Sequence, residues 1–73
     1  MRYEAVFGFN SKQWWLYDNE TDEYCDPPIS VLKEIEKIED IDEQGFRLEE
    51  IANEPNDWID DKEYRYNGED WDI

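Results

Sequence analysis

Carboxylates crowd the middle of the chain, and their spacing raises the question of a metal site. The stretch KEIEKIEDIDEQGFRLEE, residues 33–50, holds eight acidic side chains and three basic ones. Within it, residues 40–45 (DIDEQG) place oxygen ligands at alternate positions ahead of a glycine, as in the first half of an EF-hand calcium loop. The second half does not fit, because Ile51 stands where the loop requires a bidentate glutamate. We therefore expect an acidic loop without a metal.

The same carboxylates are poor candidates for catalysis. Paired acids act as general acid and base only where burial or repulsion separates their pKa values, and adjacent acids such as Asp60 and Asp61 are ordinarily solvated. The chain contains no histidine, which removes the commonest general base. Its one cysteine, Cys25, lies between Glu23 and Asp26, and anionic neighbours raise a thiol pKa. We expect no catalytic residue, no cofactor and no enzymatic activity.

The net charge limits the classes of partner. Twenty-two Asp and Glu against seven Lys and Arg give a net charge of −15 over 73 residues, and self-repulsion of this size destabilises a compact state. Nucleic acids and anionic membranes carry the same sign, so we expect neither as a direct ligand. A basic protein partner, bound cations or screening by salt would compensate the charge. A rigid row of carboxylates resembles the row of phosphates that a nucleic-acid-binding protein normally binds.

The residues expected at such an interface lie in the second half of the chain. Acids at three- and four-residue spacing over residues 36–43 form one ridge if a single helix carries them. Aromatic residues interleaved with the later acids could anchor the interface, although we expect Trp58 and either Tyr64 or Tyr66 to be buried. The predicted partner-binding residues are Glu36, Glu39, Asp40, Glu43, Asp57, Asp60, Asp61, Glu63, Glu69, Asp70, Trp71 and Asp72.

The first quarter of the chain predicts the strands of a small α+β domain that spans residues 1–73. Residues 2–9 alternate apolar and other side chains, the period of a strand with one buried face. A turn and the apolar run QWWLYD at residues 13–18 follow, so we expect an N-terminal antiparallel β-hairpin. Residues 18–26 are expected to form a polar loop.

The sequence after residue 26 predicts two helices and a second hairpin. An apolar stripe indicates a central amphipathic helix at about residues 27–40, with Asp26 as its N-cap. Gly45 is expected just beyond that helix, where a positive φ is often required. Residues 46–55 have the period of a short helix but also of a strand, and we favour the helix. Residues 62–73 contain an Asn-Gly pair, which predicts a C-terminal β-hairpin.

Three functions are compatible with these expectations. In size and charge the chain is similar to small acidic proteins that phages and mobile elements carry against host defence, such as anti-restriction and anti-CRISPR proteins. The favoured hypothesis is an inhibitor that mimics nucleic-acid charge and blocks the basic groove of a DNA- or RNA-handling protein. The alternatives are an immunity protein or antitoxin that neutralises one basic toxin, and an acidic protein-interaction accessory domain. We expect a cytoplasmic monomer or homodimer, because no secretion signal or membrane span is evident.

The incomplete EF-hand pattern predicts that calcium does not stabilise the protein specifically. A ligand that binds only the folded state raises the Tm, whereas ions that merely screen charge act through ionic strength. We expect millimolar CaCl₂ to raise the Tm, measured by circular dichroism, no more than MgCl₂ at the same concentration. An extra increase with calcium that Asp40→Ala abolishes would contradict this expectation.

Overall fold

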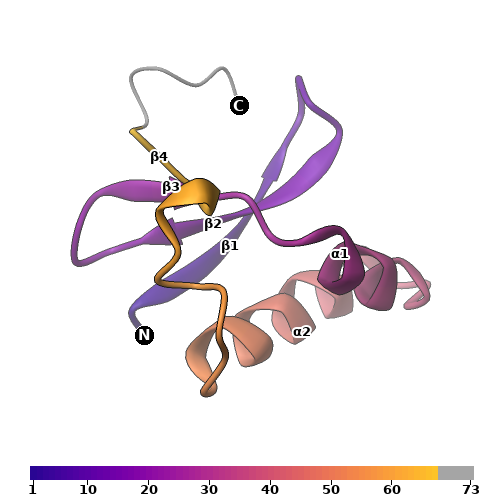
Figure 1. Ribbon diagram of the computed structural model, residues 1–73. Helices are drawn as coiled ribbons and strands as arrows, with labels where there is room; N and C mark the ends of the chain where they lie inside the picture. The colour runs from indigo at the N-terminus through magenta and orange to yellow at the C-terminus, as the bar shows by residue number, and fades with distance from the viewer. Residues whose placement is uncertain (68–73) are drawn as a thin grey trace.

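Two helices cover one face of a four-stranded antiparallel sheet in the computed structural model, which describes residues 1–67 (Figure 1). The strands are β1 (Tyr3–Gly8), β2 (Gln13–Asp18), β3 (Glu23–Cys25) and β4 (Arg65–Asn67), in the spatial order β1-β2-β3-β4. The helices are α1 (Ile29–Glu36), α2 (Ile41–Asn53) and the short 3₁₀ helix η1 (Lys62–Tyr64). The predicted α+β class is confirmed.

The N-terminal hairpin forms as the alternation of its side chains predicts. β1 pairs with β2 in a register that joins Tyr3 to Asp18 and Phe7 to Trp14. The exposure of the alternating side chains increases along β1 and the turn after it: Tyr3 is buried, whereas Phe9 is 79% exposed. The tip of the hairpin therefore extends beyond the helices that cover its base (Figure 1).

The segment expected to be a polar loop, residues 18–26, instead contains strand β3. This strand pairs with β2 on one side and with β4 on the other. Asp22 closes the preceding turn with a φ of 58°, a conformation that Asp adopts more readily than most residues. A three-residue strand is too short to show a period in the sequence. The loop prediction was therefore wrong, because pairing with two neighbours makes this strand.

Helix α1 is shorter than the predicted helix at 27–40. Pro28 occupies the N-cap position, where the missing N–H of a proline at the helix start costs no hydrogen bond. Asp26, the expected cap, instead accepts a hydrogen bond from Gln13 Nε2 at 3.2 Å. At the other end α1 stops at Glu36 and the chain turns. The prediction was wrong at both boundaries.

Helix α2 is longer than the short helix predicted at 46–55. It begins directly after Asp40, whose Oδ1 accepts hydrogen bonds from the backbone N–H groups of Asp42 and Glu43 at 2.8 and 3.3 Å. The EF-hand-like segment is thus the cap and first turn of a helix. Glu36 and Glu43 consequently lie on different helices, and the single acidic ridge predicted for one helix does not form.

The predicted C-terminal hairpin is described only in its first strand. β4 (Arg65–Asn67) pairs with β3, and the expected return strand lies outside the described residues. Trp58 is buried at 9% exposure, as expected, and Tyr64 packs against the core half-buried. The buried core cluster comprises Tyr3, Leu16, Cys25, Val31, Ile35, Leu48, Ala52, Trp58 and Ile59.

The indole ring of Trp14 packs against α2 at Gly45. Gly45 does not end a helix with a positive φ, as expected from the sequence, but lies buried inside α2. A Cβ at this position would lie 2.8 Å from Trp14 Cη2, closer than real contacts allow. The indole Nε1 also donates to Gln44 Oε1 at 3.0 Å. The absence of a side chain at Gly45 therefore sets how closely α2 approaches the sheet.

Gly45→Ala is expected to destabilise the protein, although alanine ordinarily stabilises a helix interior by about 1 kcal/mol relative to glycine. The added methyl group overlaps Trp14, and overpacking of this kind costs about 1–3 kcal/mol. Urea unfolding measures the change in free energy. Trp14→Phe provides the control, because a smaller ring leaves room for the methyl group. A cost of Gly45→Ala that is as large in the Trp14→Phe background would contradict the packing argument.

Candidate functional site

A buried aspartate lies between two arginines at the end of β2. The Asp18 side chain is fully enclosed, with 0% exposure. Its carboxylate accepts two hydrogen bonds from Arg2, at 3.1 Å from Nε and 3.0 Å from Nη2, and one from Arg65 Nη1 at 2.8 Å. The backbone N–H of Glu20 adds a fourth at 2.9 Å. Burial by itself raises the pKa of Asp18, but these hydrogen bonds outweigh it and hold the pKa well below its usual range.

Arg65 connects this carboxylate to the rest of the sheet. Its side chain is only 9% exposed. Besides Asp18, its guanidinium donates to Glu23 Oε1, the Tyr3 hydroxyl and the Ile59 carbonyl oxygen, each at 3.0 Å. Burial lowers the pKa of Arg65, but the hydrogen bonds from it to Asp18 and Glu23 raise the pKa above its ordinary value. The residue is a structural cation and is not available to a ligand.

The third arginine also forms ion pairs within the protein. Arg47 Nη2 lies 3.1 Å from Glu34 Oε1 in α1, and its Nη1 lies 3.5 Å from Glu50 Oε2 in α2. Within residues 1–67, none of the four lysines forms an ion pair. Internal neutralisation is thus concentrated at three arginines, and most exposed carboxylates have no cation beside them.

The predicted partner-binding residues form two separate groups. The elbow acids surround the turn between α1 and α2, and all four are exposed: Glu36, Glu39, Asp40 and Glu43. The loop acids lie between α2 and β4, and they too are exposed: Asp57, Asp60, Asp61 and Glu63. The elbow acids lie around the start of α2, and the loop acids follow its end along the chain (Figure 1). The predicted residues Glu69, Asp70, Trp71 and Asp72 lie outside the described residues.

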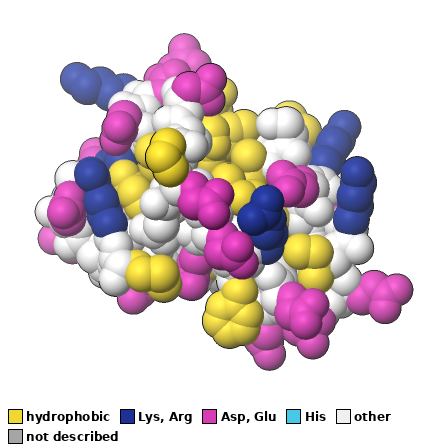
Figure 2. Space-filling model, turned by 90° about the horizontal axis from the view of Figure 1, so that it is seen from below, with side chains coloured by type: hydrophobic (Ala, Val, Ile, Leu, Met, Phe, Trp, Pro, Cys, Tyr) yellow, Lys and Arg dark blue, Asp and Glu magenta, His cyan; other side chains and the backbone are white. Residues whose placement is uncertain are grey.

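Helix α2 carries acids between these two groups. Glu43 and Glu50 are seven residues apart, so both lie on the side of α2 that faces away from the buried Leu48, and exposed Glu54 follows at the helix end. The predicted partner-binding residues did not include Glu50 and Glu54, although Glu50 follows Glu43 by seven residues and Glu54 follows Glu50 by four, which is the spacing of one helix face. Figure 2 shows the helix-covered side of the molecule, where Asp and Glu side chains are interspersed with Lys, Arg and apolar groups.

Large apolar side chains are also exposed, at the hairpin tip and on α2. Phe9 is 79% exposed at the hairpin tip, and Phe46 is 64% exposed on α2. Phe7 connects the tip to the sheet, because its ring packs edge-on against Phe9 and against Trp14, with centroids 5.8 and 5.3 Å apart. Trp14 lines two hollows, of about 310 and 160 Å³. Sequence reasoning had assigned no role to these residues.

Other chemistries find little support in the part of the chain that the structure describes. Burial raises the pKa of the Cys25 thiol to about 11, so burial, rather than the anionic neighbours cited from the sequence, is the main cause. Over residues 1–67, no three His, Cys, Asp or Glu side chains gather as a metal site would require. In the same range no helix is both long enough and apolar enough to cross a membrane.

Comparison with known proteins gives no match: no family model, curated protein or solved structure is significantly similar to this chain. The candidate site therefore stands on its geometry alone. That geometry is an exposed acidic surface along and around α2, with aromatic side chains at its elbow end, on a sheet held by the Asp18 cluster.

Asp18→Asn is expected to lower the free energy of unfolding by about 3–5 kcal/mol at pH 7, because it removes the fully buried carboxylate that pairs with both Arg2 and Arg65. The folded pKa of Asp18 is lower than its unfolded value, so its contribution is present above the unfolded pKa of about 3.9 and is lost as pH falls through the folded pKa. The difference between wild type and variant should therefore shrink below about pH 4, as measured by urea unfolding across pH.

Glu20→Gln is the matched control for Asp18→Asn. It removes the same charge from an exposed partner of Arg2, whose Nε lies 3.0 Å from Glu20 Oε2. An exposed pair of this kind contributes at most about 1 kcal/mol. Equal effects of the two substitutions, or a difference for Asp18→Asn that does not depend on pH, would contradict the assignment.

Proposed function

We propose that this protein is a cytoplasmic inhibitor that presents a nucleic-acid-like row of negative charge and occupies the basic groove of a DNA- or RNA-handling protein. The observation that carries the proposal is the exposed acidic surface along α2, on a chain of net charge −15. The inhibitor would be of the type that phages and mobile elements use against host defence. It requires no catalytic residue, cofactor or direct contact with nucleic acid.

The charge density along α2 supports mimicry of one nucleic-acid strand. Six acids and one arginine fall between Asp40 and Glu54, which gives a net charge of −5. With a rise of about 1.5 Å per residue, this segment is about 20 Å long. One strand of B-DNA carries about six phosphates over the same length, one per 3.4 Å. Glu49 is half-buried and binds the Ala5 N–H of β1, so a basic groove that fits one strand meets the other five acids, which are all exposed.

The position of this charge on a rigid element also supports the proposal. α2 is held to β1 by its own side chains: Asn53 Oδ1 accepts from the Tyr3 N–H at 3.2 Å, and Glu49 Oε1 accepts from the Ala5 N–H at 3.0 Å. Trp14 is packed against Gly45 on the same helix. Carboxylates fixed in this way lose less conformational entropy on binding than those of a disordered acidic tail.

Exposed aromatic residues favour a second candidate function, the neutralisation of one basic toxin. Phe9 and Phe46 are large apolar side chains in contact with water, and binding energy in specific interfaces concentrates in such anchors. A mimic distributes its affinity over many charges, whereas a toxin-specific inhibitor depends on a few residues. A single aromatic substitution should therefore weaken binding to the partner much more for a toxin-specific inhibitor than for a mimic.

The proposal is tested by capturing partners from a bacterial lysate with the tagged protein, with and without excess duplex DNA. The expected result is a nucleic-acid-handling protein that both DNA and added salt displace, because both compete for the same electrostatic contacts. A tight partner that neither agent displaces would overturn the mimicry and favour the toxin-neutralising function.

For a captured partner, Glu43→Gln together with Glu50→Gln is expected to weaken binding. Exposed charge pairs contribute about 0.2–1 kcal/mol each, so the two substitutions should raise the Kd about 2- to 30-fold. The control is Glu4→Gln together with Asp22→Asn, which removes the same charge from β1 and the β2–β3 turn. Isothermal titration calorimetry gives both values. Equal effects of the two pairs would show that net charge matters and α2 does not.

A further inference from the structure

The exposed edge of β1 is covered over only part of its length. β1 is an edge strand of the sheet, and α2 covers its beginning with side-chain hydrogen bonds. Asn53 accepts from the Tyr3 N–H at 3.2 Å and donates to the Tyr3 carbonyl oxygen at 3.2 Å. Glu49 accepts from the Ala5 N–H at 3.0 Å. These contacts block that part of the edge against pairing with another strand.

Beyond Ala5 the edge is open. The N–H groups of Tyr3 and Ala5 bind α2, so backbone groups at odd-numbered positions of β1 point away from β2 and those at even-numbered positions pair with it. The Phe7 N–H and carbonyl groups therefore face the open edge. The structure gives them no partner among residues 1–67. They are a donor and an acceptor at the spacing that an added strand requires.

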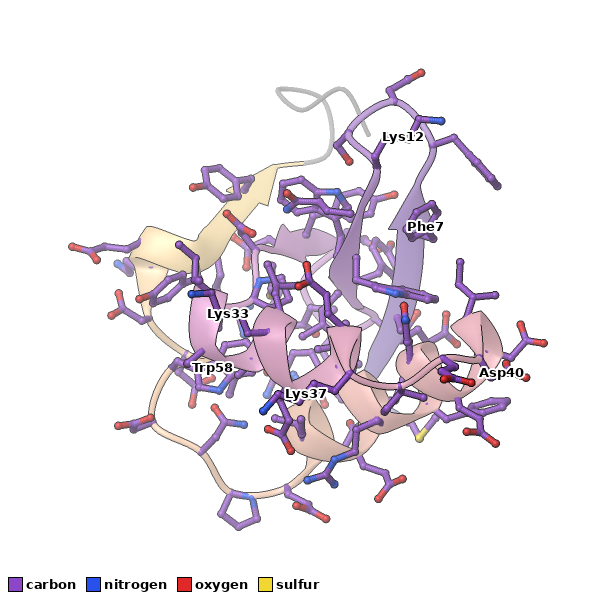
Figure 3. The ribbon with its side chains drawn as sticks, turned by 90° about the vertical axis from the view of Figure 1, so that its right-hand side faces the viewer. Phe7, Lys12, Lys33, Lys37, Asp40 and Trp58 are labelled. Atoms are coloured by element: carbon purple, nitrogen blue, oxygen red, sulfur yellow. The ribbon has the colours of Figure 1, made fainter. Side chains whose placement is uncertain are left out.

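A hollow with acidic walls lies next to this open segment. It has a volume of about 160 Å³ and lies between β1 and α2, and we call it the edge groove. Its lining residues are Ala5, Trp14, Asp42, Gly45, Phe46 and Glu49. Two carboxylates and two aromatic rings thus border it, and no lysine or arginine does. Figure 3 shows Phe7 on the hairpin above the turn that carries Asp40, from which α2 starts.

The charge of the groove decides which occupant fits. A second copy of this chain would bring another net charge of −15 and place its own Asp42 and Glu49 against the same acids, and like charges that meet across an interface are unfavourable. A lysine or arginine side chain would instead find carboxylates for its charge and aromatic rings for its methylene groups or guanidinium plane. The groove therefore complements a basic segment.

We propose that the open edge of β1 at Phe7 and the adjoining edge groove bind an extended, basic segment of the partner protein by strand addition. Backbone hydrogen bonds to Phe7 fix the segment, and an alternate side chain, lysine or arginine, enters the groove between Trp14 and Phe46. This inference rests on the proposed basic partner and adds the site at which that partner is held. The acids along α2 occupy the basic groove of the same partner, as in the proposed function.

The test uses a nine-residue peptide of alternating lysine and valine, with blocked termini, titrated into the ¹⁵N-labelled protein and followed by NMR. The expected result is a change in the amide signals of Phe7, Asp42 and Phe46 and in the Trp14 indole signal. The control peptide carries the same side chains with methylated backbone nitrogens, so it keeps every charge but cannot donate to the edge. It should bind at least about fivefold more weakly, because one backbone hydrogen bond is worth about that factor.

Matched variants distinguish the contribution of the edge groove to peptide binding from that of the overall negative charge. Asp42→Asn and Phe46→Ala should each weaken peptide binding at least threefold. Asp57→Asn, an exposed acid beyond the other end of α2, and Ile29→Ala, an apolar residue 71% exposed on α1, should leave it unchanged. Because Asp42 and Phe46 are themselves exposed, their variants should fold, and the NMR spectrum of each variant checks this.

Three results would overturn the inference. Equal binding of the two peptides, with signal changes spread over the loop acids, would leave the electrostatic attraction of the proposed function intact and exclude strand addition. No binding of either peptide would exclude the edge groove, while the capture experiment would still judge the proposed function. Signal changes at Phe7 that depend on protein concentration without peptide would identify a second copy as the occupant.

Discussion

The Asp18 carboxylate, enclosed between Arg2 and Arg65, is the interaction on which the described fold depends. It joins the residue before β1, the end of β2 and the start of β4, and Arg65 extends the connection to β3 through Glu23. The cluster therefore connects all four strands of the sheet, although β4 is far from the others in the sequence. Removing one partner of a buried ion pair is far more costly than removing a surface pair.

The same arrangement explains why the surface remains acidic. A chain with seven basic residues cannot neutralise twenty-two acids, and here the three arginines make all of the described ion pairs. Two of them stabilise the sheet and Arg47 joins α1 to α2. The carboxylates along α2 and at its two ends are thus largely without cations. Most exposed carboxylates of residues 1–67 therefore take no part in an ion pair, although Asp40 also caps α2 and Glu50 also pairs with Arg47.

The sequence predicted elements whose side-chain period is long enough to observe and failed where tertiary contacts decide. The alternation over residues 2–9 predicted β1, whereas the three residues of β3 have no visible period. The apolar stripe predicted α1, but its end depends on Asp40 capping the next helix. No role was predicted for Asp18, because nothing in the local sequence distinguishes it from Asp22. The expected acids that lie within residues 1–67 are exposed, but their division into two groups depends on the turn between the helices, which the sequence did not predict.

The central claim is that a basic nucleic-acid-binding protein accepts this acidic surface in place of nucleic acid. The most direct measurement is the Kd of a captured partner for this protein, and for duplex DNA, across a series of salt concentrations. The account predicts that log Kd rises steeply with log salt concentration for both ligands, and that the two ligands exclude each other. An affinity for this protein that salt does not change, or a complex that binds both ligands at once, would contradict it.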